Sequence, residues 1–255
     1  MHVTNAVPVR EAGSDLDGLK IVVTGASSGI GESVARLCTA RGANVAGIAR
    51  RSDRLRHLQD EFGLFPVAAD VANPVAARTA VDDAAEALGG IDAVINNAGV
   101  YLLGGVDDGQ YEDWHRMFAV NVLAVLSVTQ AALPHLKKSV RPHVVNIGSV
   151  GGRRVARPST AIYSATKFAL NAVTEGMRQE LHPLGIRVTV VSPGTVKTEI
   201  GAGSSDAVLL HDMQERQTQV GIEAAHVASA VAFVLSNPSE VTVHEVVILP
   251  TAQGL

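Results

Sequence analysis

Short apolar runs rich in valine, isoleucine and alanine alternate with longer helical patterns along this chain. Most of the runs lack alternating polar positions, which is typical of strands buried on both faces of a parallel sheet. They cover residues 20–24, 44–48, 65–69, 93–96, 143–147, 187–191 and 242–249. Helical patterns lie between them at 30–41, 54–62, 75–88, 111–138, 161–184 and 224–235. This order predicts an α/β fold, a doubly wound parallel seven-stranded sheet with helices on both faces.

The pattern continues without an internal repeat or a linker, so we expect one Rossmann-type domain over residues 18–255. Residues 1–17 lack the apolar core of a signal peptide and are interpreted as a flexible leader. The long connection at 196–222 follows a predicted strand end and contains Gly201 and Gly203. Long connections at this edge of a sheet often cover ligands, so the segment is predicted to be a substrate lid.

Composition narrows the possible functions. Of the 255 residues, 47% are hydrophobic and 18% are charged, which indicates a large core and excludes a disordered chain. The net charge is -4 and no basic run exceeds Arg153-Arg154, so no nucleic-acid partner is expected. The single cysteine, Cys38, excludes a disulfide scaffold. The most apolar stretch, 117–133, contains polar residues and is interpreted as a buried or interface helix. We therefore expect a cytoplasmic protein without a membrane span.

The first predicted strand leads directly into a glycine-rich turn and a helix, with the sequence TGASSGIG at residues 24–31. Glycines permit a tight turn and let the backbone approach a pyrophosphate, and the helix N-terminus supplies free N–H groups. The candidate cofactor-binding residues here are Gly25, Ser27, Ser28, Gly29, Ile30 and Gly31. A purely structural turn is the alternative interpretation.

Several further motifs follow this turn along the chain. They are Asp70-Val71, Asn96-Asn97-Ala98-Gly99, Asn121, Ser149, Tyr163-x-x-x-Lys167 and Pro193-Gly194. The combination resembles the classical short-chain dehydrogenase/reductase family over almost the whole chain. The resemblance implies a nicotinamide cofactor and hydride transfer between a carbonyl and an alcohol.

The end of the second predicted strand indicates which nicotinamide cofactor binds. In dinucleotide folds an acidic residue near this point binds the ribose 2′-hydroxyl of NAD, whereas an arginine accommodates the 2′-phosphate of NADP. This strand ends in Ala49-Arg50-Arg51, without an acid. We therefore predict NADP(H), with Arg50 as the principal phosphate ligand and Arg51 and Ser27 as helpers. A solvated basic helix start is the alternative, but the resemblance also points to NADP-preferring members.

Residues at two further strand ends are candidates for contacts with the adenosine. Asp70 and Val71 follow the third predicted strand, and we expect them to meet the adenine amino group and ring. Asp70 could instead cap the next helix, although Asn73 could serve that purpose.

Small residues and turns at later strand ends would accommodate the rest of the cofactor. Asn97, Ala98 and Gly99 let the backbone approach the ribose, while Asn96 is as much a structural as a functional candidate. Pro193 and Gly194 turn the chain under the nicotinamide. The backbone at Val196 and the Thr198 hydroxyl would then bind the carboxamide.

Tyr163 and Lys167 are four residues apart and therefore share one face of a predicted helix. The pKa of a free tyrosine is about 10, and we expect the nearby ammonium to lower it so that Tyr163 acts as acid or base. Ser149 ends the fifth predicted strand, where its hydroxyl can bind the substrate oxygen. The resemblance implies that the backbone carbonyl of Asn121 holds a water that links Lys167 to solvent. A hydrogen bond between helices is its alternative role, and no metal is expected at the site.

These predictions describe an NADP(H)-dependent oxidoreductase that interconverts a ketone or aldehyde and an alcohol. An NAD(H)-linked alcohol dehydrogenase is the first alternative, and a non-catalytic dinucleotide-binding regulatory protein is the second. The small-molecule substrate stays open: Arg153, Arg154 and Arg157 could meet an anionic group, but we favour a solvated turn or a subunit contact. The low charge and the apolar helices at 111–138 and 161–184 predict a homo-oligomer, either a dimer or a tetramer.

Overall fold

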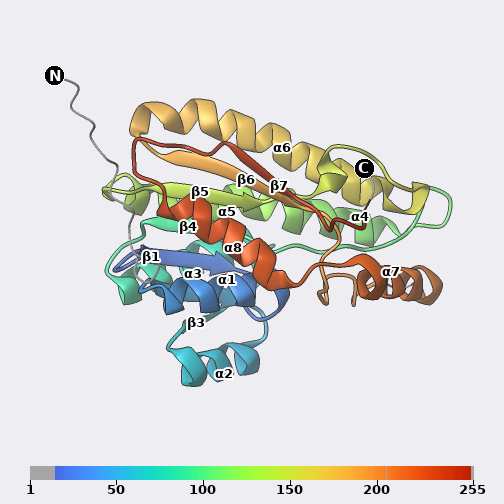
Figure 1. Cartoon of the computed structure of the whole chain (residues 1–255), viewed down its shortest axis with the longest axis horizontal. Helices are drawn as coiled ribbons and strands as arrows, with labels where there is room; N and C mark the ends of the chain where they lie inside the picture. Colours follow the sequence, from blue (N-terminus) through green and yellow to red (C-terminus); the bar gives the residue numbers. More distant parts are fainter. Residues whose placement is uncertain (1–14, 205, 254–255) are drawn as a thin grey trace.

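Seven strands lie side by side in one sheet, in the order β3-β2-β1-β4-β5-β6-β7, and every neighbouring pair is parallel. The computed structural model describes residues 15–204 and 206–253 (Figure 1). The strands are β1 (Lys20–Thr24), β2 (Asn44–Ala49), β3 (Phe65–Ala68), β4 (Ala93–Asn96), β5 (His143–Ile147), β6 (Arg187–Pro193) and β7 (Glu245–Ile248). The strand order reverses between β1 and β4, and the ends of these two strands therefore flank the crevice where such folds bind ligands. The predicted fold class is confirmed.

Helices cover both faces of the sheet, as expected from the buried strand centres. They are α1 (Gly29–Ala40), α2 (Ser52–Phe62), α3 (Pro74–Leu88), α4 (Tyr111–Phe118), α5 (Ala124–Leu136), α6 (Ala161–Leu181), α7 (Ala207–Val220) and α8 (Ala224–Ser236). On one face α1 packs against α8, and on the other α3 packs against α5, with α6 beside them. Side chains of β1 enter both cores, Ile21 and Val23 on the α1 side and Val22 on the α3 side. The apolar runs are therefore strands with two buried faces.

The helix predicted at 111–138 is interrupted. It consists of α4, a π-helical turn at Ala119–Leu123 and then α5. Asn121 lies in this turn, where its Oδ1 accepts from the backbone N–H of Val100 and its Nδ2 donates to the Val100 carbonyl, both at 2.9 Å. Single π-helical turns inside α-helices occur frequently at functional sites, and periodicity alone does not reveal them.

The segment 196–222, predicted to be a lid, contains a helix that the sequence patterns did not indicate. This is α7, which lies at the right-hand end of the view in Figure 1. Asp206 caps it by accepting hydrogen bonds from the N–H groups of Val208 and Leu209, both at 2.9 Å. None of its residues is buried, so the helix lies on the surface beside the sheet edge instead of in the core.

Among the described residues, one helical run is long and apolar enough to cross a membrane by length and composition alone. This run is Tyr111–Leu136, with a hydropathy of 1.7, and 56% of its most apolar window is buried inside the protein. It contains the buried polar residues Asn121 and Thr129 and packs against α3 and α6. Both features are typical of a core helix.

A buried polar network joins the two central strands to the helices behind them. The Asn96 amide donates to Thr129 Oγ1 at 3.0 Å and to Asn146 Oδ1 at 2.9 Å, and Asn146 Nδ2 donates to Thr174 Oγ1 at 2.9 Å. These four residues are at most 3% exposed, and they connect β4, β5, α5 and α6. Of the structural and functional roles considered for Asn96, these contacts support the structural one.

The packed part of the chain begins earlier than residue 18. Leu16 is fully buried in the core beside α1, and Asp15 pairs with Arg41 at 3.2 Å. Residues 1–14 of the predicted leader lie outside the described residues. The leader interpretation therefore does not extend to residues 15–17.

We expect the substitution Leu16→Ala to lower the free energy of unfolding by about 2–5 kcal/mol, since it removes a fully buried side chain and leaves a cavity. Val140→Ala is the matched control, because Val140 is 87% exposed and should change stability by less than about 0.5 kcal/mol. Urea unfolding of both variants gives the comparison. Equal stabilities would show that Leu16 is not part of the core.

Candidate active site

The glycine turn is fixed by hydrogen bonds between the ends of β1 and β4. Thr24, the last residue of β1, accepts at Oγ1 from the N–H groups of Asn97 at 3.1 Å and Ala98 at 3.0 Å. The Asn97 amide in turn donates to the Thr24 carbonyl at 2.9 Å and to the Gly25 carbonyl at 3.3 Å. Both segments that would meet a cofactor are therefore held as one unit.

Two glycines of the turn have no room for a side chain. A Cβ on Gly31 would lie 2.4 Å from Asn97 Nδ2 and 2.4 Å from the Gly25 carbonyl oxygen. Gly25 has a φ of +68°, and a Cβ there would lie 2.9 Å from the Cα of Ala98. The first residues of α1, Gly29 and Ile30, line the cavity beside this turn, and a helix N-terminus at such a place suits a pyrophosphate.

A first cavity, here called the adenosine cavity, extends along this turn and the ends of β2 and β3. The predicted residues that line it are Gly25, Ser27, Ser28, Gly29, Ile30, Arg50, Arg51, Asp70, Val71, Asn97, Ala98, Gly99 and Thr198. Gly31 does not line it, since it is buried behind the turn and acts through packing. The fit to a dinucleotide rests on this lining and on the steric requirement for glycine.

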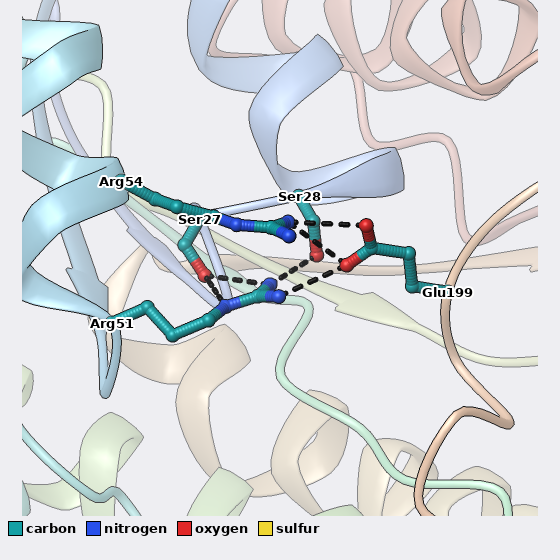
Figure 2. Close-up of polar contacts among 5 residues, drawn as sticks. All are labelled: Ser27, Ser28, Arg51, Arg54 and Glu199. Carbon is teal, nitrogen blue, oxygen red and sulfur yellow. Dashed lines mark hydrogen bonds and ion pairs between the residues drawn. The ribbon is translucent and has the colours of Figure 1, made fainter.

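Arg51, expected only as a helper, holds the glycine turn (Figure 2). Its Nε and Nη2 donate to Ser27 Oγ at 3.1 and 3.0 Å, and Nη2 also donates to Ser28 Oγ at 2.6 Å. Its Nη1 donates to the Glu199 carboxylate at 2.9 Å. Arg50 lines the same cavity as an exposed side chain. The sequence predicts Arg50 as the principal phosphate ligand and Arg51 as a helper, but it is Arg51 that contacts the glycine turn.

Two roles were considered for Asp70, an adenine contact and a cap for the next helix, and Asn73 takes the second. Asn73 caps α3 by accepting from the N–H groups of Val75 at 3.0 Å and Ala76 at 3.1 Å. The Asp70 carboxylate accepts from the N–H of Ala72 at 3.0 Å and stays exposed in the adenosine cavity. It is therefore free of the capping role and available to a ligand.

A second cavity, here called the reaction cavity, has a volume of about 470 Å³. The predicted residues that line it are Ser149, Tyr163, Lys167, Pro193, Gly194, Val196 and Thr198. It shares Ile30, Asn97, Gly99, Thr198 and Ile200 with the adenosine cavity. One extended ligand can therefore reach from the arginines at β2 to the hydroxyl of Tyr163.

Tyr163 and Lys167 lie in the first two turns of α6, directly across from the end of β5. Lys167 Nζ donates to the Ile147 carbonyl at 2.9 Å and lies 5.8 Å from the centre of the Tyr163 ring. Ser149 follows β5 and accepts from the N–H of Gly151 at 3.0 Å. Tyr101 packs on Tyr163 with ring centres 4.2 Å apart. Three groups able to bind or protonate a substrate oxygen thus face one cavity.

The amino-acid sequence matches the family described as short chain dehydrogenase over residues 20–208. The chain belongs to the short-chain dehydrogenase family. An uncharacterized oxidoreductase of Staphylococcus saprophyticus is 37% identical over 240 residues, covering 92% of this chain and 97% of that protein.

Solved structures of this family have the same fold. A short-chain dehydrogenase from Burkholderia cenocepacia in complex with NADP has a TM-score of 0.81 and 34% identity, covering 92% of this chain and 98% of that one. The closed form of a serine dehydrogenase complexed with NADP+ has a TM-score of 0.84 and 29% identity, covering 92% and 96% of the two chains. Short-chain dehydrogenases are oxidoreductases that bind a nicotinamide dinucleotide and act on small molecules.

The acidity of Tyr163 differs from the expectation. Burial raises its pKa well above the ordinary value, and this outweighs a hydrogen bond with Ser149 that lowers it; Tyr101 raises it further. Burial also lowers the pKa of Lys167 to about 8. The predicted lowering by the ammonium is absent because desolvation opposes the charged form of both groups. Near neutral pH Tyr163 is therefore a phenol, able to give a proton.

Asn121 lines neither cavity. Besides its two bonds to Val100, its Nδ2 donates to Thr166 Oγ1 at 3.0 Å. It is 1% exposed and connects the loop after β4 to α6, so its side chain makes the interhelical hydrogen bond considered as the alternative. A role for its backbone carbonyl toward Lys167 stays a prediction.

Several residues at the site were not indicated by the sequence. Thr24 aligns the two loops through its hydroxyl, and its position as the last residue before the glycine turn was the available signal. Glu199 and Arg54 come together only through the fold, since they are 145 residues apart. Gln253 accepts from the N–H of Thr195 at 2.8 Å and lines the reaction cavity, although it lies near the C-terminus.

The Lys167 pKa predicts a pH-dependent cost to stability. The pKa of Lys167 in the folded state is about 8 and lies below the ordinary 10.5. Burying the charged Lys167 on folding therefore costs about 3 kcal/mol at pH values below 8. This cost disappears as pH rises from about 8 toward 10.5, because the amine is then neutral in both states. The stability of Lys167→Met minus that of wild type should fall over this range.

Urea unfolding of both proteins at several pH values from neutral upward measures this difference. Lys138→Met serves as the control, because Lys138 is exposed and its removal should produce a flat difference. A pH-independent difference for Lys167→Met would contradict the shifted pKa.

Proposed function

We propose that this protein is an NADP(H)-dependent oxidoreductase that interconverts a ketone or aldehyde and the corresponding alcohol. The observation that carries the proposal is the meeting of Ser149, Tyr163 and Lys167 in a cavity continuous with the adenosine cavity. An NAD(H)-linked alcohol dehydrogenase is disfavoured by Arg50 and Arg51 and by the lack of an acid at the end of β2. A regulatory protein without activity is disfavoured by the complete set of reactive side chains.

The residues of the two cavities suit the successive parts of a dinucleotide. The glycine turn and the start of α1 would hold the pyrophosphate, and the arginines after β2 would hold the 2′-phosphate. Asp70 and Val71 would contact the adenine, and the turn at Pro193–Gly194 with Val196 and Thr198 would hold the nicotinamide. When bound, the nicotinamide supplies or takes up a hydride.

Three side chains of the protein itself would orient the substrate oxygen and transfer a proton to it. The Ser149 hydroxyl donates to the substrate oxygen and orients it toward Tyr163. The Tyr163 hydroxyl gives its proton to that oxygen as negative charge develops there, and its raised pKa keeps the proton in place until then. Lys167, whose pKa of about 8 leaves it mostly protonated near neutral pH, stabilises the phenolate that results. In the reverse direction the same phenolate takes the alcohol proton.

Tyr163→Phe tests these roles. Removing the phenol should lower turnover by about a hundredfold or more, the usual contribution of a general acid, while NADPH still binds. Tyr111→Phe is the matched control, because Tyr111 is 69% exposed and lies outside both cavities. Absorbance assays of NADPH with a panel of carbonyl compounds and fluorescence titration with NADPH give the two readouts. Wild-type turnover by Tyr163→Phe would refute the assignment.

We also propose that the substrate carries a carboxylate. The charged side chains among the described residues that line the reaction cavity are Arg154, Arg157, Lys167 and Arg216, and none is acidic. Arg157 and Arg216 lie near enough to Tyr101 for their positive charges to lower its pKa, against the larger effect of burial, which raises it. Tyr101 in turn packs on Tyr163. An all-cationic lining in a protein with a net charge of -4 favours an anionic ligand, and arginine forks match a carboxylate. The structural similarity to a serine dehydrogenase supports an acid as substrate.

A matched pair of substrates isolates this charge. We expect a 2- or 3-oxo acid to be reduced with a higher kcat/KM than its methyl ester. Arg157→Gln and Arg216→Gln should each reduce the acid-to-ester ratio by about tenfold to a hundredfold, as expected for loss of one charged hydrogen bond. Arg153→Gln is the control, because Arg153 pairs with Glu245 and lies outside the reaction cavity. A ratio that is unchanged in both variants would contradict the proposal.

Apolar side chains on the surface of the long helices support a homo-oligomer. Phe118, Leu123, Leu126 and Phe168 are 40–56% exposed and lie on or between α4, α5 and α6. Such side chains on neighbouring helices would be covered by a second subunit. A cytoplasmic location stays a prediction.

A further inference from the structure

Glu199 ties the segment after β6 to the start of α2. It follows Thr198, and its carboxylate accepts from Arg51 Nη1 at 2.9 Å and from Arg54 Nη1 at 3.2 and 2.9 Å (Figure 2). These hydrogen bonds, from Arg51 first and Arg54 second, hold the pKa of Glu199 below its ordinary value. The carboxylate is therefore charged at neutral pH.

The Glu199 carboxylate lines the adenosine cavity and binds guanidinium N–H groups that a phosphate could also use. The Arg51 guanidinium that it binds also donates to Ser27 and Ser28 of the glycine turn, so these two hydroxyls and the Glu199 carboxylate, all in the lining of the adenosine cavity, share one guanidinium (Figure 2). A carboxylate and a phosphate oxygen use the same guanidinium N–H groups. A 2′-phosphate bound between Arg51 and the turn would thus meet the negative charge of Glu199 at close range.

The Glu199 side chain can move away without disturbing its backbone. It is 51% exposed, and its own carbonyl accepts from the N–H of Ala202 at 2.9 Å in a turn that does not involve the carboxylate. Exposed ion pairs contribute little to stability, so the pair with the arginines can be exchanged for a stronger anion at small cost. A phosphate carries more charge than the carboxylate and is the stronger partner.

We propose that Glu199 is a cofactor-specificity residue whose carboxylate occupies the 2′-phosphate position on Arg51 and Arg54 and must be displaced when NADP(H) binds. This rests on the proposed NADP(H) function. The displacement reduces the affinity for NADP(H) and leaves that for NAD(H), which lacks the phosphate, nearly unaffected. Glu199 therefore limits the selectivity that the arginines alone would provide.

Glu199→Gln removes the charge and keeps the shape of the side chain. We expect the Kd for NADPH to fall by about threefold to tenfold, consistent with loss of one exposed carboxylate from the arginines, and the Kd for NADH to change by less than about twofold. The probe pair 2′,5′-ADP and 5′-AMP, titrated by calorimetry, should give the same contrast without any nicotinamide. Glu223→Gln is the matched control, since Glu223 pairs with Lys197 and lies outside both cavities; it should change neither Kd.

The outcomes separate this inference from the proposed function. If wild type binds NADPH more tightly than NADH but Glu199→Gln leaves the NADPH Kd unchanged or raises it, the inference is wrong and the proposed cofactor stands. If Glu199→Gln lowers the Kd for NADPH and the Kd for NADH by the same factor, the inference is also wrong, because the effect would then not involve the 2′-phosphate. If wild type prefers NADH or binds neither dinucleotide, the proposed function itself is wrong.

Discussion

The hydrogen bonds between Thr24 and the Asn97-Ala98 segment are the constraint on which the rest of the site depends. They hold the ends of β1 and β4 together at the point where the strand order reverses, and a parallel sheet brings all its carboxyl ends to this edge. Gly31 has no room for a side chain because of this contact. The glycine turn then lines the adenosine cavity, which joins the reaction cavity formed by the strand end that carries Ser149 and the first turns of α6.

Charge is distributed unevenly along this crevice. Arg50 and Arg51 line the adenosine cavity, and Arg54 pairs with Glu199 at its edge. In the part of the chain that the structure describes, every charged side chain that lines the reaction cavity is cationic. Lys167 lines the reaction cavity in a buried position that lowers its pKa, so the fold keeps an ammonium there at a cost to its own stability. The carboxylate of Glu199 lies against Arg51 and Arg54. The positive charge that the adenosine cavity offers to a ligand therefore depends on whether Glu199 stays paired with these arginines.

The fold was predictable from the sequence because buried parallel strands leave uninterrupted apolar runs, and the glycine turn and the spacing of Tyr163 and Lys167 leave local signals. Features that depend on contacts between distant segments were not predictable. The π-helical turn around Asn121 has no periodicity of its own, α7 has no buried face to produce a pattern, and Glu199 meets Arg54 only across the folded sheet. The acidity of Tyr163 was predicted in the wrong direction because desolvation, which the sequence does not reveal, raises its pKa and outweighs the hydrogen bond with Ser149 that lowers it.

We propose that a hydride passes between a nicotinamide held at Thr198 and a carbonyl carbon held near Tyr163. The most direct measurement is label transfer: NADPH carrying deuterium on one or the other face of nicotinamide C4 is incubated with the protein and a carbonyl substrate, and the alcohol is analysed by mass spectrometry. Because the cofactor would be fixed by the turn after β6, we expect deuterium at the carbinol carbon from one labelled face and none from the other. An alcohol that is unlabelled with both forms, or labelled equally by both, would contradict it.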